Sequence, residues 1–358
     1  MLPAVDGKKR LLLYGAYGYT GQLAAEVAAT RGLDVVLAGR DARALTRLAG
    51  RLHLPTRVVG LDDVGLLSNA LTDIACVVHM AGPFATTSAP MLSACVATRT
   101  SYVDITGEIE VFEAIWSRAA EIERAGITVV PGAGFDVVPT DCLAAYVASR
   151  SDRPTALVLA LRGLESASRG TLRTAIRQLS KPVLCRRSGA LVALDDRSPR
   201  WIDFGAGEEP CVPVSWGDVA TAFRSTGVGN VTVYFRRTLL LRAADTLGRL
   251  FAPIVRSRIG QRALEAIVRR FPEGPSEAER IRRRTTISAE AIDASGSSFR
   301  ALLSTPDPYD FTANCALEIS SRISSLSAPL GLVTPSQAFG ADFVLSLPGC
   351  SRVDARSS

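Results

Sequence analysis

The sequence predicts an α/β protein in which a Rossmann-type, doubly wound parallel sheet is joined to a second, α+β domain. Three observations predict this class. The chain has 358 residues, 47% of them hydrophobic, which is enough for a large core and for two domains. Its first 135 residues alternate short apolar stretches with amphipathic ones. A glycine-rich turn follows the first apolar stretch, at the edge where such sheets bind ligands.

The N-terminal part predicts the parallel sheet. Strands are expected over 11–14, 35–38, 57–61, 75–80, 101–105 and 127–130, and helices over 22–31 and 42–52. Strands connected by helices in this way form right-handed crossovers, which bury the sheet on both faces.

From residue 136 the pattern changes to that of a second, partly antiparallel sheet. Its expected strands are 157–161, 232–235, 286–292 and 299–303. The last two are joined by a predicted hairpin turn, Asp293-Ala294-Ser295-Gly296. The composition of 186–199 and 272–279 predicts surface loops.

The composition excludes several classes of protein. The 41 basic and 35 acidic residues give a net charge of +6 and are spread along the chain, so nucleic acid is not an expected partner. The seven cysteines include no Cys-x-x-Cys pair and there are only two histidines, so we expect reduced, mostly buried thiols and no metal site. The start lacks a secretion signal and no apolar run could span a bilayer, so we expect a soluble cytoplasmic protein.

Residues 239–271 form a long amphipathic stretch that is rich in arginine. Such a helix can lie on an anionic membrane surface, which would make a peripheral membrane contact. The alternative is that its apolar side packs on the second domain or on a twin subunit.

The glycine-rich turn lies between the first expected strand and a helix, and reads Gly15-Ala16-Tyr17-Gly18-Tyr19-Thr20-Gly21. Gly15 permits a tight turn, Gly18 lets the backbone approach a pyrophosphate, and Gly21 permits close helix packing. Backbone N–H groups and the helix dipole attract the anion. The turn predicts a dinucleotide site, with a purely structural turn as the alternative because the spacing is G-x-x-G-x-x-G.

The end of the second expected strand indicates which dinucleotide binds. An acidic residue there would hold the ribose 2′-hydroxyl of NAD, but this sequence has Arg40. A guanidinium group pairs well with a 2′-phosphate, so the predicted cofactor is NADP(H). Asp41 is interpreted as the N-cap of the next helix, and a solvated arginine at a helix start is the alternative for Arg40.

Three further segments follow strands at the ligand-binding edge of the sheet, and they contain small or acidic residues: His79–Phe84, Tyr102–Glu108 and Pro131–Asp141. With these motifs the sequence resembles the saccharopine dehydrogenase-like oxidoreductases, especially the bacterial trans-acting enoyl reductases. The resemblance covers most of the chain and rests on GAYGYTG at 15–21, AGR at 38–40, AGPF at 81–84, YVDITGE at 102–108, GFDVVPTD at 134–141, SRGT at 168–171, WGDVATAF at 216–223 and TPSQAFGADF at 334–343.

The resemblance implies a domain organisation and an activity. Residues 1–135 would form an NADP-binding Rossmann domain, 136–328 a substrate and dimerisation domain of a homodimer, and 329–358 a segment that returns to the Rossmann domain. The implied reaction is hydride transfer from NADPH to an electron-poor C=C bond of a small-molecule or acyl-thioester substrate. An imine (C=N) reductase or amine dehydrogenase is the first alternative, and a non-catalytic NADP-binding, membrane-surface or scaffold protein is the second.

The same resemblance assigns binding residues. The cofactor-binding residues are Gly15, Tyr17, Gly18, Tyr19, Thr20, Gly21, Arg40, Ala81, Gly82, Pro83 and Phe84. The substrate-binding residues are Phe135, Asp141, Arg169, Thr171 and Trp216. Arg169 stands where the family usually has a small residue, and it could contact an anionic group of the substrate.

Reduction also needs a proton donor beside the acceptor. The Tyr-x-x-x-Lys pair of short-chain reductases is absent because Arg177 stands four positions before Lys181, and the G-x-S-x-G motif of hydrolases is missing. The candidates at the strand ends are Tyr102, Asp104, His79 and Asp136, provided that burial raises a carboxyl pKa toward neutrality. His79 is also interpreted as a neutral core histidine, the two aspartates as helix caps or ties, and Glu108 as a first-turn helix residue.

Overall fold

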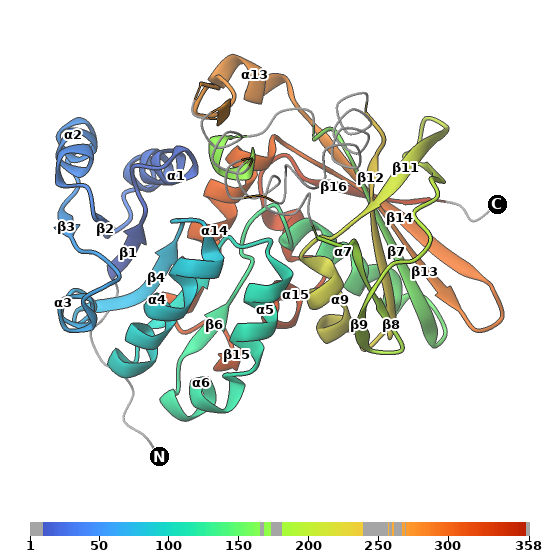
Figure 1. Cartoon of the computed structure of the whole chain (residues 1–358), viewed down its shortest axis with the longest axis horizontal. Coiled ribbons are helices and arrows are strands. Elements are labelled where there is room, and N and C mark those ends of the chain that lie inside the picture. Colours follow the sequence, from blue (N-terminus) through green and yellow to red (C-terminus); the bar gives the residue numbers. More distant parts are fainter. Residues whose placement is uncertain are drawn as a thin grey trace. The chain divides into compact units, whose positions relative to one another are not determined.

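The computed structural model describes residues 10–164, 168–172, 181–238, 257, 260, 267–268 and 270–355. They form two compact units (Figure 1). The first contains the described residues up to Val138 together with Pro308–Phe343, and the second contains Pro139–Asp307 and those from Val344 onward. Most of the amphipathic stretch 239–271 lies outside the described residues.

The first unit is built on a seven-stranded parallel sheet, as predicted, in the order β15-β6-β5-β4-β1-β2-β3. The strands are β1 (Arg10–Tyr14), β2 (Val35–Gly39), β3 (Thr56–Val58), β4 (Ile74–His79), β5 (Ser101–Asp104), β6 (Thr128–Val130) and β15 (Gly331–Leu332). β1 to β6 match the predicted strands, with ends that differ by up to three residues. The first unit is therefore a Rossmann-type sheet.

Helices of the first unit pack against each other in two groups, one with α1, α2 and α14 and the other with α3, α4, α5 and α6. Their bounds are α1 (Tyr19–Thr30), α2 (Ala42–Leu52), α3 (Val64–Asn69), α4 (Phe84–Thr98), α5 (Ile109–Trp116), α6 (Ala119–Ala125) and α14 (Pro308–Ser324), followed by the short α15 (Pro335–Phe339). Asp41 caps α2 as predicted, because its carboxylate accepts the Ala44 N–H at 3.0 Å. Both groups contact the sheet, α14 through β1, β4 and β5, and α4 through β5.

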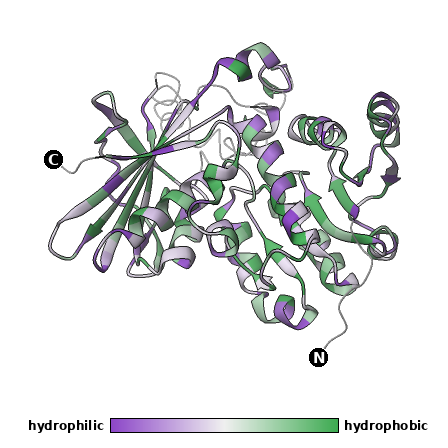
Figure 2. Cartoon of the chain, turned by 180° about the vertical axis from the view of Figure 1, so that it is seen from behind, coloured by the Kyte–Doolittle hydropathy of each residue, from purple (hydrophilic) through white to green (hydrophobic). Residues whose placement is uncertain are grey.

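The core of this unit follows from the apolar strands. Leu12, Val77 and Val129 of the central strands are fully buried, and Figure 2 shows these strands in the colours of hydrophobic residues. A strand that is covered on both faces needs a continuous run of apolar residues. Such runs are visible in the sequence, and for this reason the strands could be predicted.

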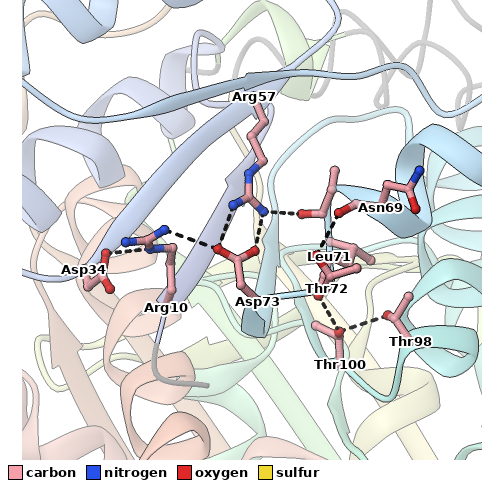
Figure 3. A network of polar contacts seen from close by, with 10 residues as sticks. Arg10, Asp34, Arg57, Asn69, Leu71, Thr72, Asp73, Thr98 and Thr100 are labelled. Atoms are coloured by element: carbon pink, nitrogen blue, oxygen red, sulfur yellow. Dashed lines mark hydrogen bonds and ion pairs between the residues drawn. The ribbon is translucent and has the colours of Figure 1, made fainter. Parts of the chain in front are cut away.

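Ion pairs connect the amino ends of the strands, at the edge opposite the predicted site (Figure 3). The Arg57 guanidinium holds the Asp73 carboxylate through two contacts of 2.7 Å. Arg10 contacts the same carboxylate at 3.2 Å and Asp34 at 2.9 Å. The hydrogen bonds from Arg57 lower the pKa of Asp73 to about 2.

The second unit contains a mixed sheet in the order β10-β11-β12-β7-β13-β14-β16, with β8 and β9 attached to β12. β12 runs parallel to β7, and the other pairs are antiparallel, as predicted for this part of the chain. The strands are β7 (Pro154–Arg162), β8 (Leu184–Arg187), β9 (Ala190–Ala193), β10 (Arg200–Asp203), β11 (Glu208–Val214), β12 (Asn230–Arg236), β13 (Thr285–Asp293), β14 (Ser298–Thr305) and β16 (Ser351–Ala355). The other elements on the described residues of this unit are α7 (Val138–Ser149), α9 (Asp218–Thr226), α13 (Glu277–Arg282) and the 3-10 helix η1 (Phe343–Ser346).

The hairpin predicted at 293–296 is confirmed, because Asp293 Oδ1 accepts the N–H groups of Ser295 and Ser297 between β13 and β14. The surface loop predicted over 186–199 is wrong in its first half, where β8 and β9 form a second hairpin. Its turn uses Ser188 and Gly189 at φ values of +46° and +82°, a pair of left-handed residues that suits a tight hairpin. The loop predicted over 272–279 ends early, because Ser276 caps α13.

The predicted division had the segment 329–358 return to the Rossmann domain of residues 1–135, whereas the first compact unit takes Pro308–Phe343 and the second takes the described residues from Val344 onward. α14 lies in the first unit, and β16, within the segment 329–358, pairs with β14 of the second sheet. All seven cysteines carry free thiols and six are buried, as predicted. Among the described residues, no helix combines the length and the apolar character needed to cross a membrane.

Candidate functional site

The candidate site lies at the carboxyl ends of β1, β4, β5 and β6, which are adjacent parallel strands. The strand order reverses between β1 and β4, since β2 and β3 lie on one side of this pair and β5 and β6 on the other. In open sheets of this kind, ligands bind outside the carboxyl ends of the strands at such a reversal. The glycine turn follows β1 and the three predicted loops follow β4, β5 and β6.

The glycine turn has the close contacts that were predicted for it. Gly15 has a φ of +82°, and a Cβ there would lie 2.8 Å from the Cβ of Ala81 in the loop after β4. A Cβ at Gly21 would lie 2.3 Å from the Gly15 carbonyl oxygen. Gly18 is the N-cap of α1 and contributes no side-chain acceptor to the helix start. These features leave a tight backbone turn at a helix N-terminus, which suits a phosphate group.

The aromatic residues of the turn are held by neighbours in the first unit. A Cβ at Gly39, the last residue of β2, would lie 2.5 Å from the Tyr17 ring, so the ring lies directly against this backbone. The Tyr19 ring makes an edge contact with Tyr309 of α14, with 5.0 Å between the ring centres. The turn is thus fixed on two sides.

Arg40 follows β2 directly and is exposed. Its guanidinium group forms no ion pair with any residue that the structure describes. An exposed cation beside the glycine turn is available for a second anionic group of a dinucleotide.

The loop after β4 connects the glycine turn to Glu108. Ala81 contacts Gly15, as described above, and α4 begins at Phe84. Its N-cap, Pro83, offers no side-chain acceptor, and the Glu108 carboxylate accepts the N–H groups of Phe84 and Ala85 instead, both at 3.1 Å. In the sequence Glu108 directly precedes α5. Its carboxylate nevertheless stabilises the N-terminus of another helix, α4.

His79, at the end of β4, is fully buried. Its Nε2 lies 3.1 Å from the Thr87 hydroxyl, which donates its own proton to the Ala81 carbonyl oxygen at 2.6 Å. The hydroxyl therefore accepts from Nε2–H. Burial lowers the pKa of His79 to about 3, and its ring packs against Tyr14, Phe84 and Tyr102. These contacts fit the neutral core histidine rather than a proton donor.

Asp104 and Tyr102 form one buried hydrogen-bonded group at the end of β5. The Asp104 carboxylate accepts the Tyr102 hydroxyl at 2.8 Å, the Gly132 N–H at 2.9 Å and the Thr106 N–H at 3.0 Å. Burial raises the pKa of Asp104 to about 6 and that of Tyr102 well above its usual value. Because Asp104 binds the loops after β5 and β6 to each other, its contacts suit a positioning role.

Asp136, in the loop after β6, has a different environment. Its side chain lies against Gly107, where a Cβ would come within 2.6 Å of Oδ2. Among the described residues no donor is hydrogen-bonded to this carboxyl group, and the residue is partly exposed. Desolvation of the carboxyl group by the atoms packed around it and, to a lesser extent, the nearby Glu108 charge raise its pKa to about 7. A carboxyl group of this kind can hold a proton at neutral pH and release it.

The predicted substrate-binding residues are distributed over both units. Phe135 belongs to the first unit, where its buried ring packs on Phe311 and its N–H donates to Thr312 at 3.0 Å. Asp141 belongs to the second unit, is buried in α7 and accepts the hydroxyl of Ser225. Both residues therefore have structural contacts.

The other three lie in the second unit. Arg169 donates from Nε to the Phe271 carbonyl oxygen at 2.6 Å and has Glu273 at 3.8 Å, so its guanidinium group is bound to the chain. The Thr171 hydroxyl lies 3.1 Å from that of Ser168, and the Trp216 ring packs on Phe235. Their contacts place these residues within their own unit and leave their assignment to a substrate as a prediction.

Sequence reasoning missed the role of Glu108 in capping α4 and the contact of Gly107 with Asp136. The signal for the first was available, because Pro83 cannot cap α4 with its side chain and an acceptor had to come from elsewhere. The second has no signal in one sequence, since glycine occurs in many loops without such a contact.

Comparisons with known proteins agree with the site. Residues 11–130 match the family described as the saccharopine dehydrogenase NADP binding domain. The chain is 25% identical to a trans-acting enoyl reductase of Mycobacterium ulcerans, over 94% of this chain and 95% of that protein. It is also 27% identical to a saccharopine dehydrogenase-like oxidoreductase of Bos taurus, in a match that covers 45% of this chain and only 42% of the bovine protein.

A solved structure supports the fold. The apo form of the L-Glu-forming saccharopine dehydrogenase of Saccharomyces cerevisiae superimposes with a TM-score of 0.63, covering 91% of this chain and 94% of that one at 12% identity. At this identity the likeness concerns the fold.

Proposed function

This chain is an NADP-binding oxidoreductase whose N-terminal domain is of the saccharopine dehydrogenase family, and on that premise we propose that it reduces an electron-poor C=C bond of a small-molecule or acyl-thioester substrate. The predicted family and the predicted NADP(H) cofactor are confirmed by the match over residues 11–130. The choice of a C=C acceptor is supported by the similarity, along nearly the whole chain, to a protein named a trans-acting enoyl reductase.

The cofactor would be held by the glycine turn and by Arg40. The tight approaches at Gly15 and Gly21 and the helix start at Gly18 fit a pyrophosphate, and Arg40 fits a 2′-phosphate. When bound, NADPH supplies a hydride to the acceptor. The residues 81–84 border the turn through the contact of Ala81 with Gly15, and we assign them to the same site.

Asp136 is the residue that we propose as the proton donor, and its environment is the observation on which the mechanism depends. A reduced C=C bond must receive one proton in addition to the hydride. The Asp136 carboxyl group lies at the carboxyl edge of the sheet, and its pKa of about 7 keeps much of it protonated at neutral pH. A general acid works best when its pKa lies near the working pH.

Asp104, Tyr102 and Glu108 have positioning roles in this proposal. Asp104 holds the loop that begins at Thr106 and the loop that begins at Pro131, and Tyr102 completes its hydrogen bonds. Glu108 fixes the start of α4 and, by its charge, helps to keep Asp136 protonated. His79 contributes packing and a hydrogen bond to Thr87.

The proposal is tested by presenting the purified protein and NADPH with three kinds of acceptor: an α,β-unsaturated thioester, the corresponding saturated thioester, and a cyclic imine. Oxidation of NADPH with the unsaturated thioester alone is the expected result. Oxidation with the imine alone would favour the C=N reductase. Enhanced NADPH fluorescence on binding, with no oxidation by any acceptor, would favour the non-catalytic scaffold.

A further inference from the structure

A pocket of about 370 Å³ opens at one end of the second sheet, and its lining is dominated by arginine. The lining residues are Arg162, Gly163, Glu209, Arg236, Arg282, Arg283 and Arg284. All seven of these described lining residues belong to the second unit.

The strand topology explains why these residues meet. β7 and β12 are adjacent and parallel, so Arg162 and Arg236, at their carboxyl ends, lie at the same edge of the sheet. β13 runs antiparallel to β7 and therefore begins at this edge, directly after Arg284. β11 runs antiparallel to β12 and brings Glu209 to the same edge.

Gly163 allows the two basic segments to approach. It follows Arg162 with a φ of +98°, and a Cβ there would lie 2.6 Å from the Arg284 carbonyl oxygen. A larger residue would push the run Arg282–Arg284 away from the end of β7. The backbone therefore holds the arginines of two distant segments at one place.

Five of the described lining residues are arginines. Glu209 is the one carboxylate among the described lining residues, and it pairs with both Arg162, at 2.7 Å, and Arg236. Glu279, outside the lining, lies 3.6 Å from Arg283. Arg282 and Arg284 have no carboxylate partner among the described residues, so positive charge remains in this concave region, where it attracts an anion.

The Arg162 guanidinium group is also prearranged. Arg162 is fixed by Glu209, by a hydrogen bond of 3.4 Å to the Thr286 hydroxyl and by the face of the Phe204 ring. Arg282 and Arg284 are exposed and form no ion pair with any carboxylate in the described part of the chain. Ordered donors next to unneutralised cations are what an oxyanion with several charges requires.

We propose that this pocket binds a phosphate-bearing anion, with Arg162 and Arg236 as the fixed part of the site and Arg282 and Arg284 as the residues that close on the ligand. A guanidinium group offers two parallel N–H donors to phosphate oxygens, and several of them around one pocket match a polyanion better than a single carboxylate. The proposal rests on the second unit alone and holds whatever bond the enzyme reduces.

Calorimetric titration with inorganic pyrophosphate tests the site in the intact protein. The titration is made with saturating NADP⁺, so that the glycine turn of the first unit is already occupied. The wild type should bind pyrophosphate, and the double variant Arg282→Gln/Arg284→Gln should bind it about tenfold more weakly or worse, because charged hydrogen bonds are lost. The single variant Arg282→Gln should lie between them.

The matched control is Arg153→Gln/Arg197→Gln, which removes the same charge from exposed positions of the second unit that do not line the pocket. It should bind pyrophosphate as the wild type does. An equal loss of affinity in this control, no binding to the wild type, or tighter binding of the dicarboxylate glutarate than of pyrophosphate would overturn the proposal.

A second pair of probes identifies the source of the phosphate. If it belongs to the carrier of a thioester substrate, coenzyme A should bind more tightly than pyrophosphate, lose affinity in the double variant, and bind more tightly than pantetheine, which has no phosphate. If the ligand is free phosphate, pyrophosphate should bind at least as tightly as coenzyme A. Either order of affinity for coenzyme A and pyrophosphate supports the site. The site is contradicted if pantetheine and coenzyme A bind with equal affinity and the double variant changes the affinity for neither.

Discussion

Two carboxyl groups at neighbouring strand ends, Asp104 and Asp136, differ in the hydrogen bonds that reach them. Asp104 accepts three bonds and holds two loops, while Asp136 receives none from the described residues and keeps a pKa of about 7. Both positions were predicted from the sequence as candidate proton donors. Their roles could not be separated there, because the separation depends on donors from Thr106 and Gly132 that only the folded loops bring into reach.

The first prediction concerns Asp136→Asn, which cannot donate the proton. We expect kcat to fall about a hundredfold or more, and the decline of wild-type activity above pH 7 to disappear from the pH profile of the variant. The Glu123→Gln variant, which removes an exposed carboxylate on α6, should keep the wild-type profile. An unchanged kcat in Asp136→Asn would remove the proton donor from the mechanism.

The same variant has an expected effect on stability. The pKa of Asp136 is raised by folding, so the folded state holds its proton more strongly, and stability is lost as the pH rises from about 4 to about 7. Asp136→Asn should therefore be more stable than the wild type at pH 8, and the difference should shrink at pH 4. Thermal unfolding at the two pH values measures this.

The second prediction concerns the cofactor specificity of Arg40. Arg40→Ala should weaken NADPH binding about tenfold or more, because a charged contact with the 2′-phosphate is lost, and should leave NADH binding unchanged. Fluorescence titration with both nucleotides measures the effect, with Arg124→Ala on α6 as the control. An equal loss of affinity for NADPH and for NADH would show that Arg40 does not bind the 2′-phosphate.

At the scale of elements, the glycine turn makes a prediction that separates binding from folding. A Cβ at Gly21 would lie 2.3 Å from a backbone oxygen, whereas at Gly18 the nearest such atom is at 3.3 Å. Gly21→Ala should therefore lower the melting temperature, while Gly18→Ala should keep it nearly unchanged and weaken NADPH binding. If Gly18→Ala binds NADPH as the wild type does, the pyrophosphate does not lie against Gly18.

Elements of the first sheet were predictable because each buried strand is a continuous apolar run, and because some helices have a side-chain start signal, as Asp41 shows for α2. The hairpin of β8 and β9 was missed because its strands are short and β9 is mostly exposed, so that its residues have the composition of a loop. Its turn, Ser188-Gly189, was the available signal. The pocket arginines were also missed, since only the topology brings Arg162 and Arg236 to the run 282–284.

At the scale of the whole molecule, the chain forms each compact unit from two separate segments. The sequence predicted both sheets and their order along the chain. The sequence could not assign α14 to one of the two units. The apolar face of an amphipathic helix indicates that the helix packs against a core, but does not indicate which sheet forms that core. That assignment is made by the contacts of α14 with α1 and with β1, β4 and β5.

The stability of the first unit should depend on pH through the ion pairs at the amino ends of its strands. The pKa of Asp73 is lowered to about 2, so its contribution is fully present above its ordinary pKa of about 4 and is lost as the pH falls toward 2. Because the side chains of Asp73 and Arg57 are both partly exposed, Asp73→Asn should lower the free energy of unfolding by only about 1 kcal/mol at pH 7. Thermal unfolding at pH 7 and at pH 2.5 should show a difference that fades at the lower pH, and an equal difference at both would contradict the assignment.

The most direct test of the central claim follows an isotope through the reaction. NADPH that carries deuterium at the transferred position is incubated with the protein and an α,β-unsaturated thioester, and the product is analysed by mass spectrometry and NMR. The account predicts a saturated product with one deuterium from the cofactor on one carbon and one solvent-derived hydrogen on its neighbour, formed far more slowly by Asp136→Asn. Recovery of the deuterium in NADPH alone, with the thioester unchanged and the cofactor bound, would contradict it.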